Sequence, residues 1–506
     1  MSPFYRCFYE HVIVQITAER GNFMSIFKMF FEVVVAFYKP IGLSLENELD
    51  STQGGCHTRN GKGLRYDEHE YCASSYTHGR CCLDDDVRNI GIAHDTGPSV
   101  FLWRNVGAKI GIEHADDVLW CTRSRCSGVY RLGLVYLVRT PWCRGGFAHP
   151  FEFFGLHNAV ITDDGNIVDG SHGYANVIDI GFQLTFAAIA TALISGAIAE
   201  RVKFGTWLTF VGLWVTLVYC PLVFMVWNDG LLSAASEGIA AHLFGTHDGR
   251  AAIAPIDFAG GSVIEVSSGV SGLVLALVVG KRRSFLRSPQ RPHNLPMVML
   301  GAALLWFAWL GFNGGSVFGV NGTAALAWMN TTAAGAAGLL GWLGAERIRD
   351  GHATSLGAAS GVVAGLVAIT PVAGALTPVT SLLMGAIAGV LSAFAVDWKY
   401  RLRYDDTLDV VGVHLVSGLW GLIVTGLLAH GQGLLTGGGI DGFKLVIVQM
   451  ILAIVSLAFV GTMTIIIALA LRFTMGWRVD RETEATGIDA AVHAETAYDN
   501  AGSEFR

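Results

Sequence analysis

The chain has 506 residues, of which 15% are charged, and its mean hydropathy is +0.47. Soluble proteins average about 25% charged residues, so this composition argues against a soluble globular protein and for an integral membrane protein. The formal net charge of −7 identifies no partner, because the 34 basic and 41 acidic residues are unevenly placed. We expect no nucleic-acid partner and no cofactor.

Residues 1–144 form a first region that differs from the rest. Eight of the nine cysteines lie here, and the ninth is Cys220. One modest apolar stretch, 23–45, is interrupted by three charged residues and makes a poor membrane span. The cysteines are compatible with a disulfide framework or a metal site, although no CxxC pair has zinc-ligand spacing. A third interpretation is a mistranslated or misjoined gene start.

From about residue 145, apolar segments long enough to cross a bilayer recur along the chain. Glycine is frequent inside them, as is typical of transmembrane helices that pack tightly. We predict nine spans, at about 177–200, 205–227, 258–280, 296–315, 324–345, 353–371, 376–396, 407–429 and 443–472.

Basic residues cluster after alternate predicted spans, and the intervening loops are nearly free of them except for Arg250. The clusters are Arg201 and Lys203; Lys281, Arg282, Arg283, Arg287 and Arg291; Arg347 and Arg349; Lys399, Arg401 and Arg403; Arg472 and Arg478. The positive-inside rule then predicts that these loops and the C-terminus are cytoplasmic. It also predicts that the loop 228–256 is outside.

Two segments share a pattern that predicts a site between them. Segment 257–273, DFAGGSVIEVSSGVSGL, places Glu265 among small and apolar residues. A charge within a membrane helix costs roughly 2.5–3.5 kcal/mol on insertion scales, so Glu265 is expected to face a polar cavity or a partner. The candidate partner is His414, in segment 409–422, DVVGVHLVSGLWGL.

Aligning Glu265 with His414 puts a serine and two glycines at i+3, i+4 and i+7 in both copies, on one helical face. The matched pairs are Ser268/Ser417, Gly269/Gly418, Gly272/Gly421 and Leu273/Leu422. Small residues let helices approach closely, and a repeat of this kind indicates a site at the repeat interface. The alternative is a shared packing motif with two incidental polar residues.

Several runs occur in order between residues 145 and 498: FQLTFAAIATALISGAIAERVKF, DFAGGSVIEVSSGVSGL, PHNLPMV, WLGFNGGS, DDTLDVVGVHLVSG and RVDRETEATGIDAAVHAETAY. Together they resemble the ammonium transporter family (Amt/Mep/Rh). The resemblance implies an all-α multi-pass membrane protein with the ammonium-transporter fold: eleven transmembrane helices in two inverted five-helix halves, one pore per subunit and a homotrimer. It divides the chain into an atypical segment 1–144, a membrane domain 145–475 and a cytoplasmic tail 476–506.

The first departure from the family lies before residue 145, where its first two helices belong and nothing resembles them. A frame error would preserve length and destroy hydropathy, and it would scatter Cys, His and Arg as seen here. Another frame upstream of codon 145 should then encode two apolar segments of about 20 residues each. A genuine extracellular extension is the alternative.

The second departure is Glu265, where the family usually has a histidine paired with the one that matches His414. A glutamate–histidine pair can still share a proton across the pore. Unlike two histidines, it can also carry a negative charge, which stabilises a nearby cation or proton.

Other residues carry over from the family individually. Trp227, Ser316 and Phe182 resemble the outer site that recruits ammonium, where a tryptophan face attracts the cation. Phe186 and Phe312 resemble the phenylalanine gate below that site. Judged without the family, Trp227 is equally well an interfacial anchor. The alternative for Phe186 and Phe312 is ordinary helix packing, and for Phe182 the sequence alone favours packing.

Two aspartates stand near predicted helix starts. Asp257 can cap free backbone N–H groups there. It also resembles the family's essential aspartate, which shapes the binding site without being a direct ligand. Asp409, five residues before His414, is interpreted likewise as a cap.

Two functions remain open. The first is a transporter that recruits NH4+ outside, deprotonates it near Phe186 and conducts NH3 past Glu265 and His414, while the proton moves separately. The second is an ammonium sensor or receptor on the same scaffold, with 1–144 as a sensing domain. A signalling domain after Tyr498 would favour the sensor, and eight residues follow it.

An enzyme is not expected, because no nucleotide-binding glycine loop, GxSxG elbow or metal-ligand spacing stands out. The family places such a protein in the plasma membrane, in contact with lipid. It also implies that the tail contacts neighbouring subunits and a P-II-type regulatory protein at the cytoplasmic face.

Overall fold

The computed structural model describes residues 141–143, 147–148, 156, 158–287, 292 and 294–494. The predictions for residues 1–144, including the fate of the family's first two helices, therefore lie outside the described residues apart from Pro141–Cys143.

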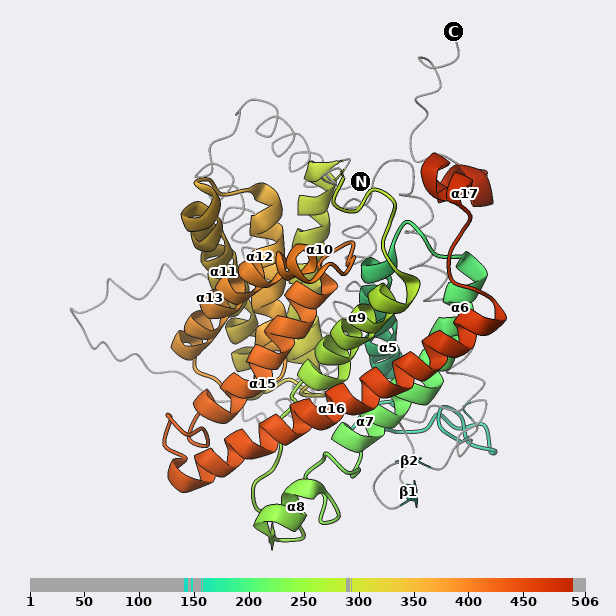
Figure 1. Ribbon diagram of the computed structural model, residues 1–506. Helices are drawn as coiled ribbons and strands as arrows, with labels where there is room; N and C mark the ends of the chain where they lie inside the picture. Colours follow the sequence, from blue (N-terminus) through green and yellow to red (C-terminus); the bar gives the residue numbers. More distant parts are fainter. Residues whose placement is uncertain are drawn as a thin grey trace, which may run out of the picture. The chain divides into compact units, whose positions relative to one another are not determined.

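The described part of the chain is predominantly helical (Figure 1). Its apolar helices are α5 (Asn176–Ile198), α6 (Phe204–Trp214) continued by the π-helix η4 (Val215–Tyr219) and α7 (Cys220–Trp227), the π-helix η5 (Gly261–Val266) continued by α9 (Ser267–Val279), α10 (Leu295–Gly315), α11 (Gly322–Asp350), α12 (Ser355–Ile369), α13 (Pro378–Ala395), the π-helix η6 (Val411–Leu415) continued by α15 (Val416–Leu428), and α16 (Gly439–Thr474).

Shorter elements connect these helices or follow them. They are α8 (Ile239–Phe244), α14 (Trp398–Leu402), α17 (Arg481–Thr486), the π-helix η7 (Asp489–His493) and two small hairpins, β1 (Pro141–Cys143) with β2 (Phe147–Ala148) and β3 (Thr246–His247) with β4 (Arg250–Ala251). The strands are two or three residues long, so the all-α prediction holds.

All nine predicted segments are helical, but only seven of the described helices are both long and apolar enough to cross a membrane. The prediction of nine spans is corrected at α11 and α12. The helix α12 is apolar but has only 15 residues, about 23 Å at the α-helical rise. The helix α11 has 29 residues, but Asn330, Thr331, Thr332 and several glycines lower the hydropathy of its uncharged part.

Side-chain caps begin four consecutive helices in the second half of the chain. Asn294 accepts a hydrogen bond at the start of α10, Asn321 at α11 and Thr354 at α12. Thr377 does the same at α13, where it forms a capping box and Pro378 follows at the first helical position. Each cap satisfies backbone donors that lack a partner in the first turn.

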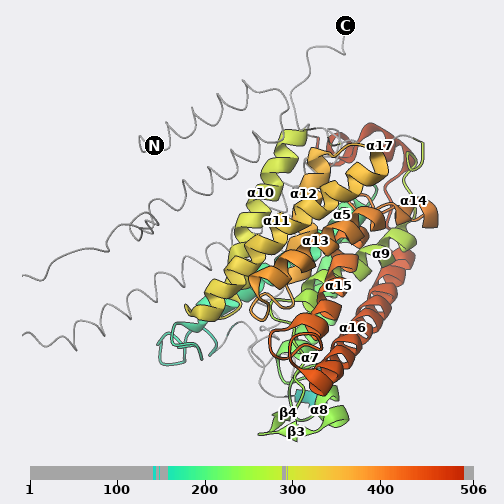
Figure 2. The same cartoon turned by 90° about the vertical axis from the view of Figure 1, so that its left-hand side faces the viewer.

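Glycines bring α11, α12 and α13 into backbone contact. A Cβ on Gly338 would lie 2.4 Å from the Gly361 carbonyl oxygen, and one on Gly389 would lie 2.1 Å from that of Gly338. No side chain fits at such distances, so close helix approach requires glycine here. Figure 2 shows these three helices side by side.

The two segments of the sequence repeat enter the helix bundle from opposite ends. Asp257, just before η5, lies at the end that carries α8, where its carbonyl oxygen accepts a hydrogen bond from Trp227 at the end of α7. Asp405, just before η6, lies at the end that carries α17, where its carbonyl oxygen binds Arg201. Figures 1 and 2 both place α8 and α17 at opposite ends. This arrangement is the inverted repeat expected from the sequence.

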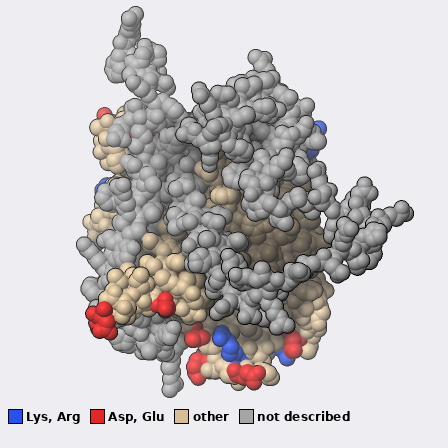
Figure 3. All heavy atoms as spheres, turned by 180° about the vertical axis from the view of Figure 1, so that it is seen from behind, with Lys and Arg blue, Asp and Glu red and all other residues tan. Residues whose placement is uncertain are grey.

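Exposed side chains on the membrane helices are largely apolar. Among the most exposed are Val379, Ile348 and Phe473, at 75%, 86% and 82%. On the face seen in Figure 3, charged side chains gather near one end, and the middle of the visible described surface is largely uncharged. Such a band suits contact with lipid.

Candidate functional site

The predicted pair of Glu265 and His414 is in contact in the structure. Nδ1 of His414 lies 2.8 Å from Oε2 of Glu265, and the two residues are 7% and 0% exposed. Glu265 lies in η5 and His414 in η6, so each sits in the first turns of its half of the repeat. Among the described residues, Oε1 of Glu265 has no hydrogen-bond partner. A buried carboxylate with one unused oxygen can take up or pass on a proton.

A glycine in each half of the repeat lets the other half come close enough for this contact. A Cβ on Gly269 would meet the backbone of Leu415, next to His414, at 2.7 Å. A Cβ on Gly418 would meet Cβ of Glu265 at 3.1 Å. The close helix approach predicted from the aligned glycines is confirmed at both positions.

The aligned serines, in contrast, do not pair with each other across the repeat. Ser268 donates to the Ala190 carbonyl oxygen in α5 at 2.7 Å. Ser417 lies 2.6 Å from the hydroxyl of Ser392 in α13. Each serine therefore ties its own half of the repeat to a neighbouring helix.

Aspartates accept hydrogen bonds at the starts of both π-helices. Oδ2 of Asp257 accepts from the backbone of Ser262 at 3.0 Å, from its hydroxyl at 2.5 Å and from the backbone of Val263 at 3.3 Å. Burial raises the pKa of Asp257 to about 6, while the hydrogen bonds from Ser262 act in the opposite direction. Asp257 thus has the cap geometry expected of it.

Asp409 does not make the cap expected of it, and Asp406 does. Oδ2 of Asp406 accepts from the Val411 backbone at 2.7 Å, whereas the carboxylate of Asp409 pairs with Lys399 at 2.6 Å. The backbone of Asp409 is left-handed, with φ of 62°, and this turn points its side chain away from the helix start. The sequence held a signal for Asp406, because it precedes His414 by eight residues, as Asp257 precedes Glu265.

The residues predicted to recruit and gate ammonium lie together at the α8 end. The ring centroids of Phe186 and Phe312 are 4.4 Å apart, and both residues are almost fully buried. Phe182 packs edge-on against Phe186 at 4.8 Å, and Trp227 does so at 6.1 Å. Ser316 lies one turn beyond Phe312 and donates to its carbonyl oxygen at 2.7 Å.

Trp227 is half-buried, as is Ser316, whereas the three phenylalanines are buried. Its indole N–H donates to the Asp257 carbonyl oxygen at 2.7 Å, which fixes the plane of the ring. The α8 end therefore carries an oriented, partly accessible aromatic face next to two buried phenylalanines. An aromatic face of this kind attracts cations.

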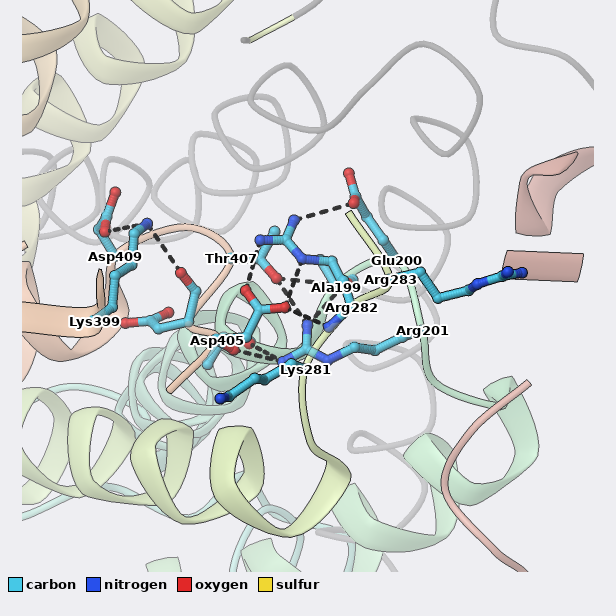
Figure 4. Close-up of polar contacts among 12 residues, drawn as sticks. Ala199, Glu200, Arg201, Lys281, Arg282, Arg283, Lys399, Asp405, Thr407 and Asp409 are labelled. Atoms are coloured by element: carbon cyan, nitrogen blue, oxygen red, sulfur yellow. Dashed lines mark hydrogen bonds and ion pairs between the residues drawn. The ribbon is translucent and has the colours of Figure 1, made fainter. Parts of the chain in front are cut away.

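A buried ionic cluster occupies the opposite, α17 end (Figure 4). Arg282, after α9, forms a two-pronged pair with Asp405 at 2.7 and 2.9 Å and contacts Glu200 at 3.1 Å. Arg201 donates to Thr407 and to the Asp405 carbonyl oxygen. The cluster joins the chain after α5 and α9 to the chain before η6.

The cluster also shifts the pKa values of its members. Burial lowers the pKa of Arg201 to about 10. Burial alone would raise the pKa of Asp405, but hydrogen bonds from Arg282 and the charges of Arg201 and Arg282 hold that pKa below its usual value. The sequence predicted these arginines only as basic loop residues.

Comparisons with known proteins agree with this fold. The family described as Ammonium Transporter Family matches residues 142–498. An ammonium transporter of Mycobacterium bovis is 50% identical over 334 residues, which cover 63% of this chain and 67% of that protein. One of Bacillus subtilis is 41% identical over 323 residues, covering 63% and 74%.

Solved structures match the fold. The crystal structure of Saccharomyces cerevisiae Mep2 superimposes with a TM-score of 0.67 at 28% identity, covering 82% of this chain and 92% of that one. A structure described as a sensor Amt protein has a TM-score of 0.69 at 23% identity, with coverage of 80% and 96%, and shares the fold. The family match spans more than half of the chain, so this multi-pass membrane protein belongs to the ammonium transporter family, whose members are transporters and not enzymes.

Proposed function

We propose that the protein recruits NH4+ at Trp227, Ser316 and Phe182, removes a proton near Phe186, and conducts NH3 along Glu265 and His414 while the proton travels separately. The observation that carries this proposal is the 2.8 Å contact between Glu265 and His414, buried where the two halves of the repeat meet. The relatives named ammonium transporters support the choice of substrate.

Recruitment rests on the orientation of Trp227. A cation over a tryptophan face gains about 0.5–2 kcal/mol. The hydrogen bond to the Asp257 carbonyl oxygen holds that face in place without using the ring. The cap made by the Asp257 carboxylate fixes the backbone that presents this carbonyl oxygen, so Asp257 shapes the site and is not a direct ligand.

Deprotonation follows from the phenylalanine pair below. Phe186 and Phe312 are 1% and 2% exposed, and their rings offer no hydrogen bonds to replace the water around a cation. Moving an ion into such surroundings costs far more than moving a neutral molecule. Neutral ammonia therefore passes when the rings rotate apart, and the proton is left behind.

The Glu265–His414 pair provides a path for that proton. A hydrogen bond between the two groups offsets part of the cost of keeping them away from water. In this proposal the two residues share the proton across their hydrogen bond. Glutamate adds a state that two histidines lack, in which the pair carries a negative charge.

The same proposal includes orientation and assembly. The basic loops at the α17 end support a cytoplasmic position for that end and for the C-terminus. We expect the protein in the plasma membrane, because the proposed function is uptake. A homotrimer, and a P-II-type regulatory protein bound at the α17 end, are expected from the family resemblance.

The test replaces the carboxylate in the full chain, with uptake and current measured against pH in cells lacking other ammonium transporters. Glu265→Gln keeps shape and polarity but removes the titratable acid, so ammonium-driven current should fall at least about tenfold. Glu265→His should retain transport with a shifted pH profile. Glu237→Gln, at an exposed glutamate in the loop before α8, is the matched control and should change neither.

Two results would overturn the proposal. If the unaltered chain takes up no ammonium at any pH, the transport function is wrong. If both Glu265 variants share the pH profile and the charge per ammonium of the unaltered chain, the pair is structural and the proposed proton path is wrong.

A further inference from the structure

A polar cluster lies in the loop before α5, outside the residues assigned to transport. Nδ1 of His172 is 2.8 Å from Oδ2 of Asp179, and the Tyr174 hydroxyl donates to Oδ1 of the same carboxylate at 2.7 Å. The side chain of Asp179 is 10% exposed and that of His172 is 38% exposed. The buried carboxylate in the first turn of α5 therefore fixes the position of a surface histidine ring.

The histidine ring in turn lies flat on Phe318. Their centroids are 4.7 Å apart and their planes are inclined by 12°. Phe318 belongs to the turn after α10, far from His172 in sequence, and is half-buried. Its backbone is left-handed, with φ of 55°, a conformation that bulky residues rarely adopt without an external constraint. The stack with His172 supplies such a constraint.

Phe318 connects this cluster with the aromatic site. Its ring packs edge-on against Phe182 at 5.8 Å, and Phe182 packs against the gate residue Phe186 at 4.8 Å. Phe318 is also only two residues from Ser316. A continuous series of ring contacts thus runs from an exposed histidine to the recruitment residues.

We propose that His172, held by Asp179, positions Phe318 as one wall of the recruitment site, so that this site selects ammonium over its methylated homologue. This inference rests on the proposed function. In this proposal a fixed Phe318 ring next to Phe182 restricts the space for an added methyl group, and a mobile ring gives way. His172 and Asp179 are positioning residues that touch no substrate, and Phe318 is the specificity-determining residue.

The experiment compares ammonium with methylammonium uptake in the full chain and reports the ratio of their kcat/KM values. Phe318→Leu and His172→Ala should each raise the kcat/KM for methylammonium relative to that for ammonium by about threefold to tenfold. One methyl group in an apolar site typically changes discrimination by about this much. His172→Phe keeps a ring on Phe318 but loses the hydrogen bond to Asp179, so its ratio should lie between those of His172→Ala and the unaltered chain. His247→Ala, at an exposed histidine in the β3–β4 hairpin, is the control.

The double variant separates positioning from general stabilisation. If His172 acts through Phe318, combining His172→Ala with Phe318→Leu should change the ratio no more than Phe318→Leu alone. Additive effects, or a ratio that stays unchanged while uptake of both substrates falls equally, would overturn the inference. If His172→Ala fails to reach the membrane, Phe318→Leu still decides, because an unchanged ratio in that variant excludes Phe318 as the specificity-determining residue. An unaltered chain that takes up neither substrate would refute the proposed function first, and this inference with it.

Discussion

Asp257 and Asp406 hold equivalent places, each accepting a backbone hydrogen bond five residues ahead at the start of a π-helix. Burial raises the pKa of both to about 6, and in Asp406 the neighbouring Asp409 raises it further against the charge of Lys399. The π-helix places its donors differently from an α-helix, and such turns are common at functional sites. These two carboxylates therefore help determine where Glu265 and His414 lie.

Asp406 should make stability depend on pH. Its pKa in the folded protein is about 6, whereas an unfolded chain holds an aspartate near about 4. The folded state binds this proton more tightly, so the stabilisation is complete below about pH 4 and is lost as the pH rises through about 6. Asp406→Asn keeps an acceptor for Val411 and has no proton to lose. The free energy of unfolding of the unaltered protein should therefore fall as the pH rises from about 5 to 7.5. In Asp406→Asn this fall should be smaller by about 1 kcal/mol.

Thermal unfolding of the purified protein across this pH range measures the effect of Asp406→Asn. Asp248→Asn, at a side chain that is 90% exposed, serves as the control and should follow the unaltered protein. Parallel pH curves for Asp406→Asn and the unaltered protein would show that this carboxyl does not titrate near pH 6.

At the scale of elements, the short helix α17 is tied to the membrane domain mainly through Glu484. One carboxylate oxygen accepts from the Arg283 backbone at 2.9 Å, and the other accepts from the Arg478 guanidinium at 2.5 Å. Arg478 also donates to the Lys281 carbonyl oxygen at 2.6 Å. A cleft of about 380 Å³ lies between these loops and α17. The tail thus contacts the segment that follows α9. At its other end α9 continues from the π-helix η5, which carries Glu265.

Loosening this attachment should reduce transport. Glu484→Gln removes the charge that pairs with Arg478, and deletion of 478–498 removes the whole attachment, so maximal uptake should fall severalfold with membrane abundance unchanged. The exposed neighbour Glu482→Gln is the matched control. If the protein lacking 478–498 takes up as much ammonium per molecule as the unaltered protein, the tail does not influence the pore.

The sequence predicted the positions of the helices more accurately than it predicted the contacts of the candidate site. Runs of about 20 apolar residues and caps such as Asn321 and Thr354 are local signals, so the helices could be placed within a few residues. The Glu265–His414 pair was predictable because the repeat aligned the two residues. The cap by Asp406 depends on the left-handed turn at Asp409, and the His172–Phe318 stack depends on two distant loops. The repeat alignment held a signal for Asp406, whereas no local pattern encodes the His172–Phe318 stack.

At the scale of the molecule, the ionic cluster of Glu200, Arg201, Arg282 and Asp405 joins the two halves of the repeat at the α17 end (Figure 4). Arg282 and Asp405 have side chains that are 7% and 0% exposed. Removing one partner of a buried ion pair leaves an uncompensated charge, which typically costs about 3–5 kcal/mol. The cluster should therefore govern whether the two halves stay together.

Arg282→Met should lower the free energy of unfolding by about 3 kcal/mol or more, because it leaves the buried Asp405 carboxylate without the cation that pairs with it. Adding Asp405→Leu should recover part of this loss. The exposed neighbour Lys281→Met is the control. Detergent-solubilised protein unfolded by heat gives the comparison, and a single Arg282→Met variant as stable as the control would contradict the assignment.

The helix α16 has 36 residues, about 54 Å at about 1.5 Å per residue. Its uncharged part, between Lys444 and Arg472, is about 40 Å long, whereas the hydrocarbon layer is about 30 Å thick. A helix of this length is accommodated by tilting, and Figure 1 shows it running obliquely across α9. In a thinner bilayer it must lean further. The thickness of the surrounding lipid therefore sets the angle at which α16 rests against the helix that carries Glu265.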